Sequence, residues 1–459
     1  MRPVALSQLA AWAEGRLLGG DATIQAVATD SRKLPAGALF VALRGENFDG
    51  HDFAAQAAAN GATALLLHHD VETELPRVLC ADTEEALGEI AAGMQKGRRA
   101  AVLALTGSNG KTSVKTLVTG MLARVGLAYC NPGNRNNEIG LPLAVLDAPE
   151  EAEFAIYEMG AGKPGDIAYL ASIVPPQVAL VNNIAPAHME RMGSLLGIAE
   201  TKGAIYEALP DDGIAVINAD DAFAPYFHSV VGARRCFRFA IENDADVRAS
   251  RILPGVEGSR FCLHTPAGNA EVALPLPGLH NVRNALAAAA LALAAGAPLD
   301  AIVAGLREAQ PVAGRQVAYR LDNGATVVDD SYNANPGSVA AAIATLATSG
   351  SESWLVLGDM KELGADAEAL HAQIGAQARD ARLARLWTVG ALSRAASQAF
   401  GARAAHFETQ EALVAALREA MAASDATRLR LLVKGSRSSA MDKVVAALRG
   451  TQEGAGHAA

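Results

Sequence analysis

The stretch AVLALTGSNGKTSVKT, residues 101–116, decides the fold of this chain. Residues 101–105 are all apolar and predict a short buried strand. From Ser113 onward, apolar residues recur at the spacing of one helical face, at Val114, Leu117, Val118 and Leu122. Between strand and helix lies a glycine-rich turn. This combination predicts a phosphate cradle, because the backbone N–H groups of the turn and the helix dipole both point toward an anion.

The turn also carries the side chains that nucleotide binding needs. The candidate nucleotide-binding residues are Thr106, Gly107, Ser108, Asn109, Gly110, Lys111, Thr112 and Ser113. Lys111 would reach the terminal phosphates, and the hydroxyl of Thr112 would hold Mg²⁺. The motif is shorter than the full Walker pattern, because Leu105 stands where that pattern has its first glycine. A tight turn with a surface lysine is the alternative, but the flanking strand and helix favour phosphate binding.

Length and composition narrow the class of protein. At roughly 150 residues per domain, 459 residues predict about three domains. The most apolar stretch, 285–297, is too short to span a bilayer, and residues 1–20 show no signal peptide, so no membrane insertion is expected. The four cysteines lack metal-type spacing and indicate reduced thiols in a cytoplasmic protein. The net charge of −10 argues against a nucleic-acid partner.

Strands and helices alternate along most of the chain, which predicts an α/β fold in three domains. Residues 1–98 are expected to form a small α/β domain, 99–312 a central domain with a parallel sheet, and 313–450 a separate, Rossmann-like doubly wound domain. Residues 451–459 are expected to be a disordered tail. Within the first domain we expect a helix over 4–18, and a linker over 95–99.

Polar side chains follow the predicted strands of the central domain. Glu158 follows a strand, as do Asn182 and Asn218, and ligands of open α/β sheets bind at that edge. His188 and Lys202 come soon afterwards. Each has a plainer alternative: Glu158 could be an exposed strand end, His188 a structural histidine, and Lys202 a surface lysine on a helix. A functional role for Glu158, His188 and Lys202 is favoured because all three are expected at the edge of the sheet that carries the glycine-rich turn.

Three further groups are candidates for ligand contact. Asp30, Ser31 and Arg32 could bind an anion or simply pair within a turn, and the residues alone leave the two equally open. Asn281 could cap a helix or contact a ligand. In the third domain, Gly435, Ser436 and Arg437 follow a strand that ends at Lys434 and lie near a helix start, which suggests an anion such as a carboxylate.

Several long motifs occur in the order found in the Mur ligases, and the chain resembles that family. They are TGSNGKTS (106–113), GNRNNEIGLP (133–142), YEMGA (157–161), His188 with Gly193, Ser194 and Lys202, and GLHNVRNALAA (278–288). The resemblance implies an ATP-dependent enzyme that forms amide bonds in peptidoglycan synthesis. It thereby links the chain to the cell wall, cell shape and cell division.

Other motifs are similar to the family member that joins UDP-N-acetylmuramoyl-tripeptide to D-alanyl-D-alanine through an acyl phosphate. These are DDSYNANP (329–336), LGDMKELG (357–364), VKGSR (433–437) and, in the nucleotide-sugar domain, TDSRKLPAGALFVALRGENFDGHDF (29–53). Residues 438–442, SSAMD, depart from the family pattern, which continues there with a Met-rich run ending in Glu. The resemblance implies that 1–98 binds the UDP-sugar, 99–312 binds ATP, and 313–450 binds the dipeptide and closes on ATP in a monomeric protein.

The resemblance also assigns roles to single residues, with ATP and Mg²⁺ as cofactors. The catalytic residues it implies are Lys111, Lys202 and His188, and the implied metal ligands are Thr112, Glu158, His188 and Lys202 in carbamylated form. It implies further nucleotide contacts from Asn281, Arg315 and Asp330. The substrate contacts are Asp30, Ser31, Arg32, Asn137, Asn333, Asn335, Lys434, Ser436 and Arg437.

Two rival functions stay open on the residues alone. The first is another amide ligase of the same architecture, which would add a single amino acid such as glutamate. The second is a non-catalytic ATP-binding switch, which would need the glycine-rich turn but not Glu158, His188 and Lys202 together.

Overall fold

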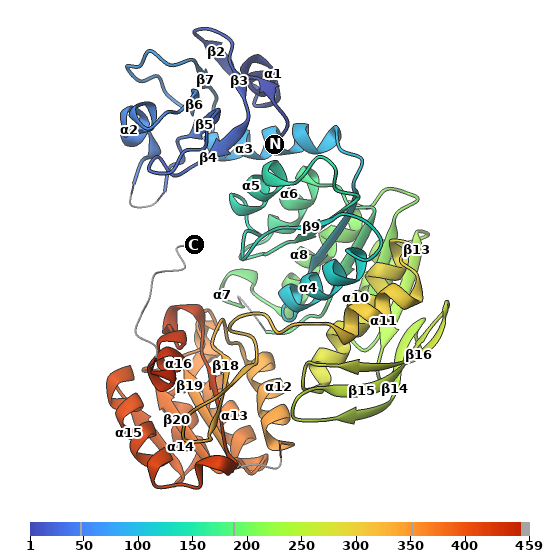
Figure 1. The fold of residues 1–459 in the computed structure, drawn as a ribbon, viewed down its shortest axis with the longest axis vertical. Coiled ribbons are helices and arrows are strands. Elements are labelled where there is room, and N and C mark those ends of the chain that lie inside the picture. Colours follow the sequence, from blue (N-terminus) through green and yellow to red (C-terminus); the bar gives the residue numbers. More distant parts are fainter. Residues whose placement is uncertain (46–47, 187–188, 350–351, 451–459) are drawn as a thin grey trace.

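The computed structural model describes residues 1–45, 48–186, 189–349 and 352–450. The described chain forms three bodies in sequence order, blue at one end of Figure 1, green to yellow in the middle, and orange to red at the other end. Each body is built around its own main sheet. His188 and the tail 451–459 lie outside the described residues, so the expectations placed on them stay predictions.

The N-terminal body has a five-stranded sheet in the order β2-β7-β6-β5-β4, with β1 and β3 paired beside it. Strands β4, β5, β6 and β7 run parallel to one another, and β2 runs antiparallel to β7. The elements are β1 Val4–Ala5, α1 Leu6–Trp12, β2 Arg16–Leu18, β3 Thr23–Ile24, β4 Ala26–Ala28, β5 Ala38–Val41, η1 Gly50–Phe53, α2 Ala54–Ala59, β6 Ala64–Leu67, β7 Arg77–Leu79 and α3 Thr83–Lys96.

Two expectations for this body are wrong. The helix expected over 4–18 ends at Trp12, because Glu14 takes a left-handed φ of 48° and the chain turns back as β2. Gly15 fits this turn because a Cβ there would lie 2.5 Å from the side chain of Val78 on β7. The linker expected over 95–99 begins inside α3, whose apolar face continues to its last turn and buries Met94 and Gln95.

The central body has a nine-stranded sheet in the order β16-β15-β14-β13-β12-β11-β8-β10-β9. Strands β9, β10, β8, β11, β12, β13 and β14 run parallel to one another. Strand β15 is antiparallel to both of its neighbours, β14 and β16. The strands are β8 Ala101–Thr106, β9 Ala128–Cys130, β10 Phe154–Glu158, β11 Val178–Val181, β12 Ile214–Asn218, β13 Arg235–Ala240, β14 Val247–Pro254, β15 Ser259–Thr265 and β16 Gly268–Leu274. The helices are α4 Lys111–Leu122, α5 Gly140–Asp147, α6 Asp166–Ile173, α7 Met189–Met192, α8 Leu195–Glu207, α9 Ala224–Val231, α10 Leu279–Ala294 and α11 Leu299–Arg307.

Both faces of this sheet are covered, which explains the uninterrupted apolar run of β8. Leu103 and Leu105 pack with α4, α10 and α11 on one face, and Figure 1 shows these three helices side by side. Val102 and Ala104 face the opposite layer, which includes α5, α6 and the N-terminal body's α3. A parallel strand buried on both faces carries no alternating polar residues. Because β8 lies between β10 and β11, their carboxyl ends meet at one edge.

The C-terminal body has a six-stranded sheet in the order β17-β18-β22-β19-β20-β21, in which only β17 is antiparallel to its neighbour. The strands are β17 Val317–Arg320, β18 Thr326–Asp330, β19 Glu352–Gly358, β20 Arg385–Val389, β21 Ala404–Phe407 and β22 Leu429–Lys434. The helices are α12 Pro336–Ala347, η2 Gly364–Asp366, α13 Ala367–Asp380, α14 Arg394–Phe400, α15 Gln410–Ala422, η3 Ala426–Arg428, η4 Arg437–Ser439 and α16 Asp442–Arg449.

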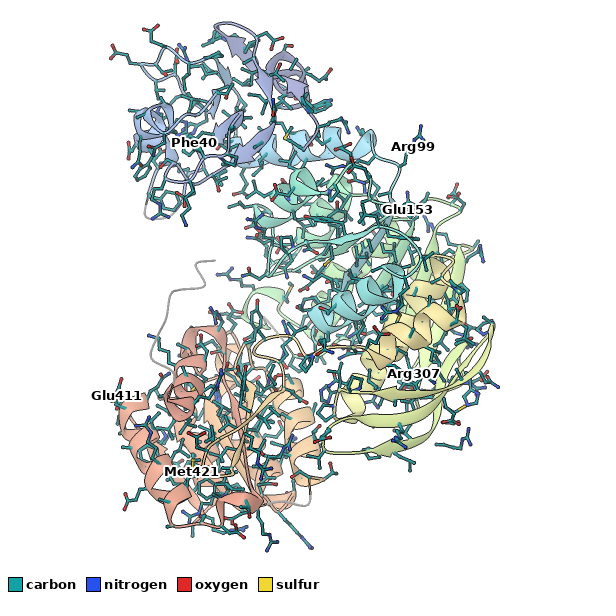
Figure 2. The ribbon with its side chains drawn as sticks, viewed as in Figure 1. Phe40, Arg99, Glu153, Arg307, Glu411 and Met421 are labelled. Atoms are coloured by element: carbon teal, nitrogen blue, oxygen red, sulfur yellow. The ribbon has the colours of Figure 1, made fainter. Side chains whose placement is uncertain are left out.

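Side chains of β19 alternate between the two faces of this sheet. Trp354 and Val356 belong to one apolar cluster, and Leu355 and Leu357 belong to the other. The expected doubly wound arrangement is therefore observed, with helices on both faces. Figure 2 labels Met421, which α15 buries against this sheet. Among the residues that the structure describes, no helix combines the length and apolar character that crossing a bilayer requires.

Candidate active site

A cavity of about 810 Å³ lies where the central and C-terminal bodies meet. Its central-body wall contains the glycine-rich turn, several strand ends and the start of α10, and its other wall belongs to the C-terminal body. The predicted site residues that line it are Ser108, Asn109, Gly110, Lys111, Ser113, Asn137, Glu158, Asn281, Arg315, Asp330, Asn333, Asn335 and Lys434. Thr106, Gly107, Thr112, Lys202, Ser436, Arg437 and residues 30–32 are not part of its lining.

The glycine-rich turn is held in shape by the end of β11. The Nδ2 atoms of Asn182 and Asn183 donate to the carbonyl oxygen of Asn109, over 2.9 and 3.0 Å. The backbone N–H of Asn109 donates in return to Asn183 Oδ1, over 2.9 Å. Gly110 ends the turn at a φ of 79°, and α4 begins at the next residue. The turn is thus fixed before any ligand binds, which favours anion binding by its N–H groups.

Gly110→Ala should abolish nucleotide binding at this turn. A Cβ at Gly110 would lie 2.3 Å from Asn284 Oδ1 and 2.7 Å from Asn182 Nδ2, and an L-residue at a φ of 79° is strained. We expect ADP affinity to fall by at least about a hundredfold, because Asn182 holds the turn and Asn284 Oδ1 accepts a hydrogen bond from Asn182 Nδ2 over 3.2 Å. Titration calorimetry with ADP measures this loss. Gly120→Ala on α4, where a Cβ meets nothing within 4 Å, is the matched control and should bind ADP normally.

Glu158 is buried at the end of β10, so the alternative of an exposed strand end is wrong. Its Oε1 accepts a hydrogen bond from Asn136 Nδ2 over 2.8 Å. Its Oε2 is buried, accepts no hydrogen bond from the described residues, and lies 3.4 Å from Lys115 Nζ. Burial raises the pKa of Glu158, but the charges of Lys115, Lys111 and Arg315 outweigh that effect and hold it below its usual value.

This environment fits a bound divalent cation. Glu158 is a buried carboxylate with one oxygen free of hydrogen bonds from the described residues, and Mg²⁺ prefers carboxylate and hydroxyl oxygens. Thr106 Oγ1, at the end of the neighbouring strand β8, is likewise buried without a hydrogen-bond partner among the described residues. A metal ion at this edge of the sheet would supply the partner that Glu158 Oε2 lacks.

Lys202 is 2 % exposed on α8, which excludes the surface-lysine alternative. Among the described residues, its ammonium has no hydrogen-bond or ion-pair partner. Burial, helped by the like charge of Lys111 and opposed by Asp166, lowers the pKa of Lys202 to about 7. A buried lysine in this state is in large part a neutral amine near neutral pH, and is therefore nucleophilic.

Two hydrogen bonds join the C-terminal body to the glycine-rich turn. Arg315 Nη2 donates to Thr112 Oγ1 over 2.9 Å, and Asn335 Nδ2 donates to Asn109 Oδ1 over 2.8 Å. The guanidinium of Arg315 also lies 4.4 Å above the ring of Tyr332. These contacts place a cation from the second body beside the residues that would hold phosphates.

A buried ion pair forms the floor of the C-terminal wall. Lys434 Nζ lies 2.8 Å from Asp330 Oδ2 and also donates to the carbonyl oxygen of Asn333 over 3.0 Å. Burial raises the pKa of Asp330, and the Lys434 charge opposes this shift. The hydroxyl of Ser436 is buried and donates to the carbonyl of Asp359 over 2.7 Å, whereas Arg437 is exposed and lies 3.4 Å from Asp442.

The remaining predicted residues make local contacts. Asn281 does not cap α10: its Nδ2 donates to the carbonyl of Pro277, and the N-cap residue is Gly278. Asn137 Oδ1 accepts a hydrogen bond from the Gly140 N–H at the start of α5. In the N-terminal body, Arg32 pairs with Asp30 at 2.9 Å and lowers the pKa of that carboxyl to about 2, while Ser31 Oγ donates to Gln56 Oε1.

Comparison with known proteins assigns the chain to a protein family. Residues 23–106, 105–292 and 314–437 match, in turn, the models of the Mur ligase family catalytic domain, the Mur ligase middle domain and the Mur ligase glutamate ligase domain. The chain belongs to the Mur ligase family. The resemblance that its motifs carry is thereby confirmed.

Within the Mur ligases, the chain is similar over its whole length to curated and solved relatives. It is 46% identical to UDP-N-acetylmuramoyl-tripeptide–D-alanyl-D-alanine ligase of Escherichia coli, over 98% of this chain and 99% of that protein. A crystal structure of MurF from Acinetobacter baumannii matches with a TM-score of 0.94 and 33% identity, over 98% of this chain and 100% of that one. MurF of Thermotoga maritima in complex with ADP matches with a TM-score of 0.84, 26% identity, and 93% and 97% coverage. The predicted three-domain α/β fold is confirmed.

Sequence reasoning gives no role to Lys115, Asn136 or Tyr332, which contact predicted residues of this Mur ligase site. Asn136 lies in a motif that was recognised, but nothing local marks it as the partner of Glu158. Tyr332 is a short-range neighbour of Asp330, and its contact with Arg315 depends on the fold. Lys115 left one usable signal, because it interrupts the apolar face of α4 beside Val114 and Val118, where a lysine needs a buried partner.

Proposed function

We propose that this chain joins the terminal carboxylate of UDP-N-acetylmuramoyl-tripeptide to the amine of D-alanyl-D-alanine, with hydrolysis of ATP to ADP and phosphate. The observation that carries this proposal is the 46% identity over nearly the full length of a curated ligase with that activity. The cavity supports it, since it gathers the glycine-rich turn, Glu158 and Arg315 in one place. The product would be the pentapeptide precursor of peptidoglycan, made by a monomeric enzyme in the cytoplasm.

The reaction has two steps. A carboxylate oxygen of the tripeptide attacks the γ-phosphorus of ATP and releases ADP, which leaves an acyl phosphate. The amine of the dipeptide then attacks the acyl carbon, loses a proton, and phosphate leaves through a tetrahedral intermediate. Both steps bring anionic groups together, so positioning and charge stabilisation supply most of the catalysis.

Cationic side chains of the protein would offset the negative charge of these groups. Lys111 and the N–H groups of the turn 107–112 would hold the β- and γ-phosphates. Arg315 would contribute charge to the transferring phosphoryl group from the C-terminal body. Asp330 and Asn281 would contact the ribose and the adenine.

Mg²⁺ would be held by Thr112 and Glu158, with His188 and a carbamylated Lys202, and would neutralise charge on the phosphate oxygens. Thr112 Oγ1 also accepts a hydrogen bond from Arg315 Nη2 over 2.9 Å, which brings the C-terminal cation to this candidate ligand. Carbamylation would convert a buried amine into an anion, which explains why a lysine serves where a carboxylate is needed.

We place the two substrates on opposite sides of the nucleotide. The first domain, 1–98, would bind the UDP-sugar through Asp30, Ser31 and Arg32, and Asn137 would meet the stem peptide. The third domain, 313–450, would bind the dipeptide near Asn333, Asn335, Lys434, Ser436 and Arg437. The central domain, 99–312, would bind ATP between them.

Phosphate release tests the proposal directly. With ATP, Mg²⁺ and UDP-N-acetylmuramoyl-tripeptide, we expect sustained release only when D-alanyl-D-alanine is present, and a product heavier by that dipeptide. Phosphate release with a single amino acid in place of the dipeptide would be consistent with an amide ligase of this family, but would show that its amine substrate is different. No release with any acceptor would favour a non-catalytic nucleotide-binding protein instead.

A further inference from the structure

Helix α4 presents two lysines to the same buried carboxylate. Lys111 and Lys115 are four residues apart, which puts them on one face of the helix, and the charges of both act on Glu158. Only Lys115 forms an ion pair with Glu158, at 3.4 Å. Within the described residues, Lys111 Nζ has no anionic partner and donates to the carbonyl of Gly107, over 2.8 Å.

The ammonium of Lys115 is buried and held by the protein itself. Lys115 is 3 % exposed, and its Nζ donates to the carbonyls of Asn131 and Gly133, over 2.7 and 3.1 Å. Glu158 Oε2 lies 3.4 Å from the same ammonium, as an ion-pair partner without a hydrogen bond. Asn131 closes the network, since its Oδ1 accepts the Glu158 N–H over 2.9 Å and its Nδ2 donates to the Glu158 carbonyl over 3.0 Å. Lys115 is held by these protein oxygens and is not part of the cavity lining, unlike Lys111.

We propose that Lys115 is a positioning residue that neutralises Glu158 and so keeps the Lys111 ammonium available for the phosphates of the nucleotide. The inference rests on the proposed binding of ATP at the glycine-rich turn. The two lysines then have separate roles on one helix face: Lys115 compensates the charge of the buried Glu158, and Lys111 binds the nucleotide. Glu158 is meanwhile held with Oε2 free of hydrogen bonds from the described residues.

Replacing Lys115 by a residue without an ammonium tests whether the two lysines have these separate roles. A buried carboxylate without its cation is costly, so Glu158 would take the nearest replacement. Arg315 is engaged across the domain interface with Thr112, whereas Lys111 lies one helical turn from Lys115 and holds only a neutral carbonyl. In Lys115→Met, Lys111 would therefore pair with Glu158 and be withdrawn from the phosphates.

The test is a double-mutant cycle on ADP affinity, measured by titration calorimetry in EDTA so that no metal contributes. Lys115→Met should weaken ADP binding by about tenfold or more, the loss expected for one charge-assisted contact. Lys115→Met with Glu158→Gln should return to within about threefold of Glu158→Gln alone, because no carboxylate remains to capture Lys111. The exposed Lys443→Met is the control for loss of a lysine and should bind ADP as the wild type does.

Three outcomes overturn the inference. Unchanged ADP affinity in Lys115→Met would show that Lys111 does not depend on Lys115. Binding by the double variant as weak as that of Lys115→Met would show that Lys115 supports the loop 131–133 rather than acting through Glu158. A wild-type chain that does not bind ADP would remove the proposed nucleotide site itself, a failure distinct from the other two. If Lys115→Met alone does not fold, the comparison of the double variant with Glu158→Gln decides, since equal affinity supports the inference and a tenfold loss overturns it.

Discussion

Arg315→Met is expected to lower kcat by at least about a thousandfold, the effect of removing a cation that stabilises a transferring phosphoryl group. ADP affinity should change by less than about threefold, because ADP lacks the γ-phosphate on which the transition-state charge develops. Arg315 comes from the C-terminal body but donates to Thr112 on the glycine-rich turn, and Tyr332 supports its guanidinium at 4.4 Å. Steady-state phosphate release and ADP calorimetry on the same preparations measure the two quantities.

The matched control is Arg320→Met, which removes an exposed arginine from β17, the strand that follows Arg315. Arg315→Lys should recover only part of the rate, because an ammonium keeps the charge but loses the planar fork of donors. A crosslink that holds the C-terminal domain open should reproduce the Arg315→Met result, with nucleotide binding retained and turnover lost. Retained turnover in the crosslinked protein, or a kcat within tenfold of wild type in Arg315→Met, would contradict a role for this arginine in the chemical step.

The sequence predicted those parts of the fold that depend on local pattern. The strand at 101–105 and the helix after Gly110 were recognisable because their apolar residues repeat at strand and helix spacing within a few residues. Strand β21 was missed, since its four residues are all only half-buried at a sheet edge. The helix expected over 4–18 was too long, because the turn at Glu14 is set by packing of Gly15 against β7 rather than by apolar periodicity.

The same limit separates the predicted site residues from the missed ones. Glu158 could be found because one rule, that ligands gather at the carboxyl ends of parallel strands, needs only the strand boundaries. Lys115 could not be given a role, because its role depends on Glu158 and on the carbonyls of residues 131 and 133, which the fold alone brings together. The domain boundaries at 98 and 312 remain predictions, and α3 packs on α5 and α6 across the first of them.

Lys202→Ala should lower turnover by about a thousandfold or more, comparable to the loss of a group that holds charge in the transition state. Acetate or formate should restore part of the rate, because the cavity left by the side chain can admit a small carboxylate in place of a carbamate. Wild-type turnover should fall when dissolved CO₂ is removed and recover when bicarbonate is added. Lys202→Met, which fills the space without a nitrogen, should show neither response.

The pH dependence follows from the chemistry of carbamate formation. Only the neutral amine attacks CO₂, and the product releases a proton as it becomes an anion. Because burial lowers the pKa of Lys202 to about 7, the reactive fraction increases as pH rises through that value rather than near the ordinary lysine value of 10.5. At fixed CO₂, activity should therefore climb between about pH 6 and pH 8, a range set by one unit on either side of that pKa. Two results together would contradict carbamylation: a turnover rate that does not depend on CO₂ at any pH, and an intact protein mass that never includes one added CO₂. Lys202 would then be a buried neutral amine and not a ligand of the metal.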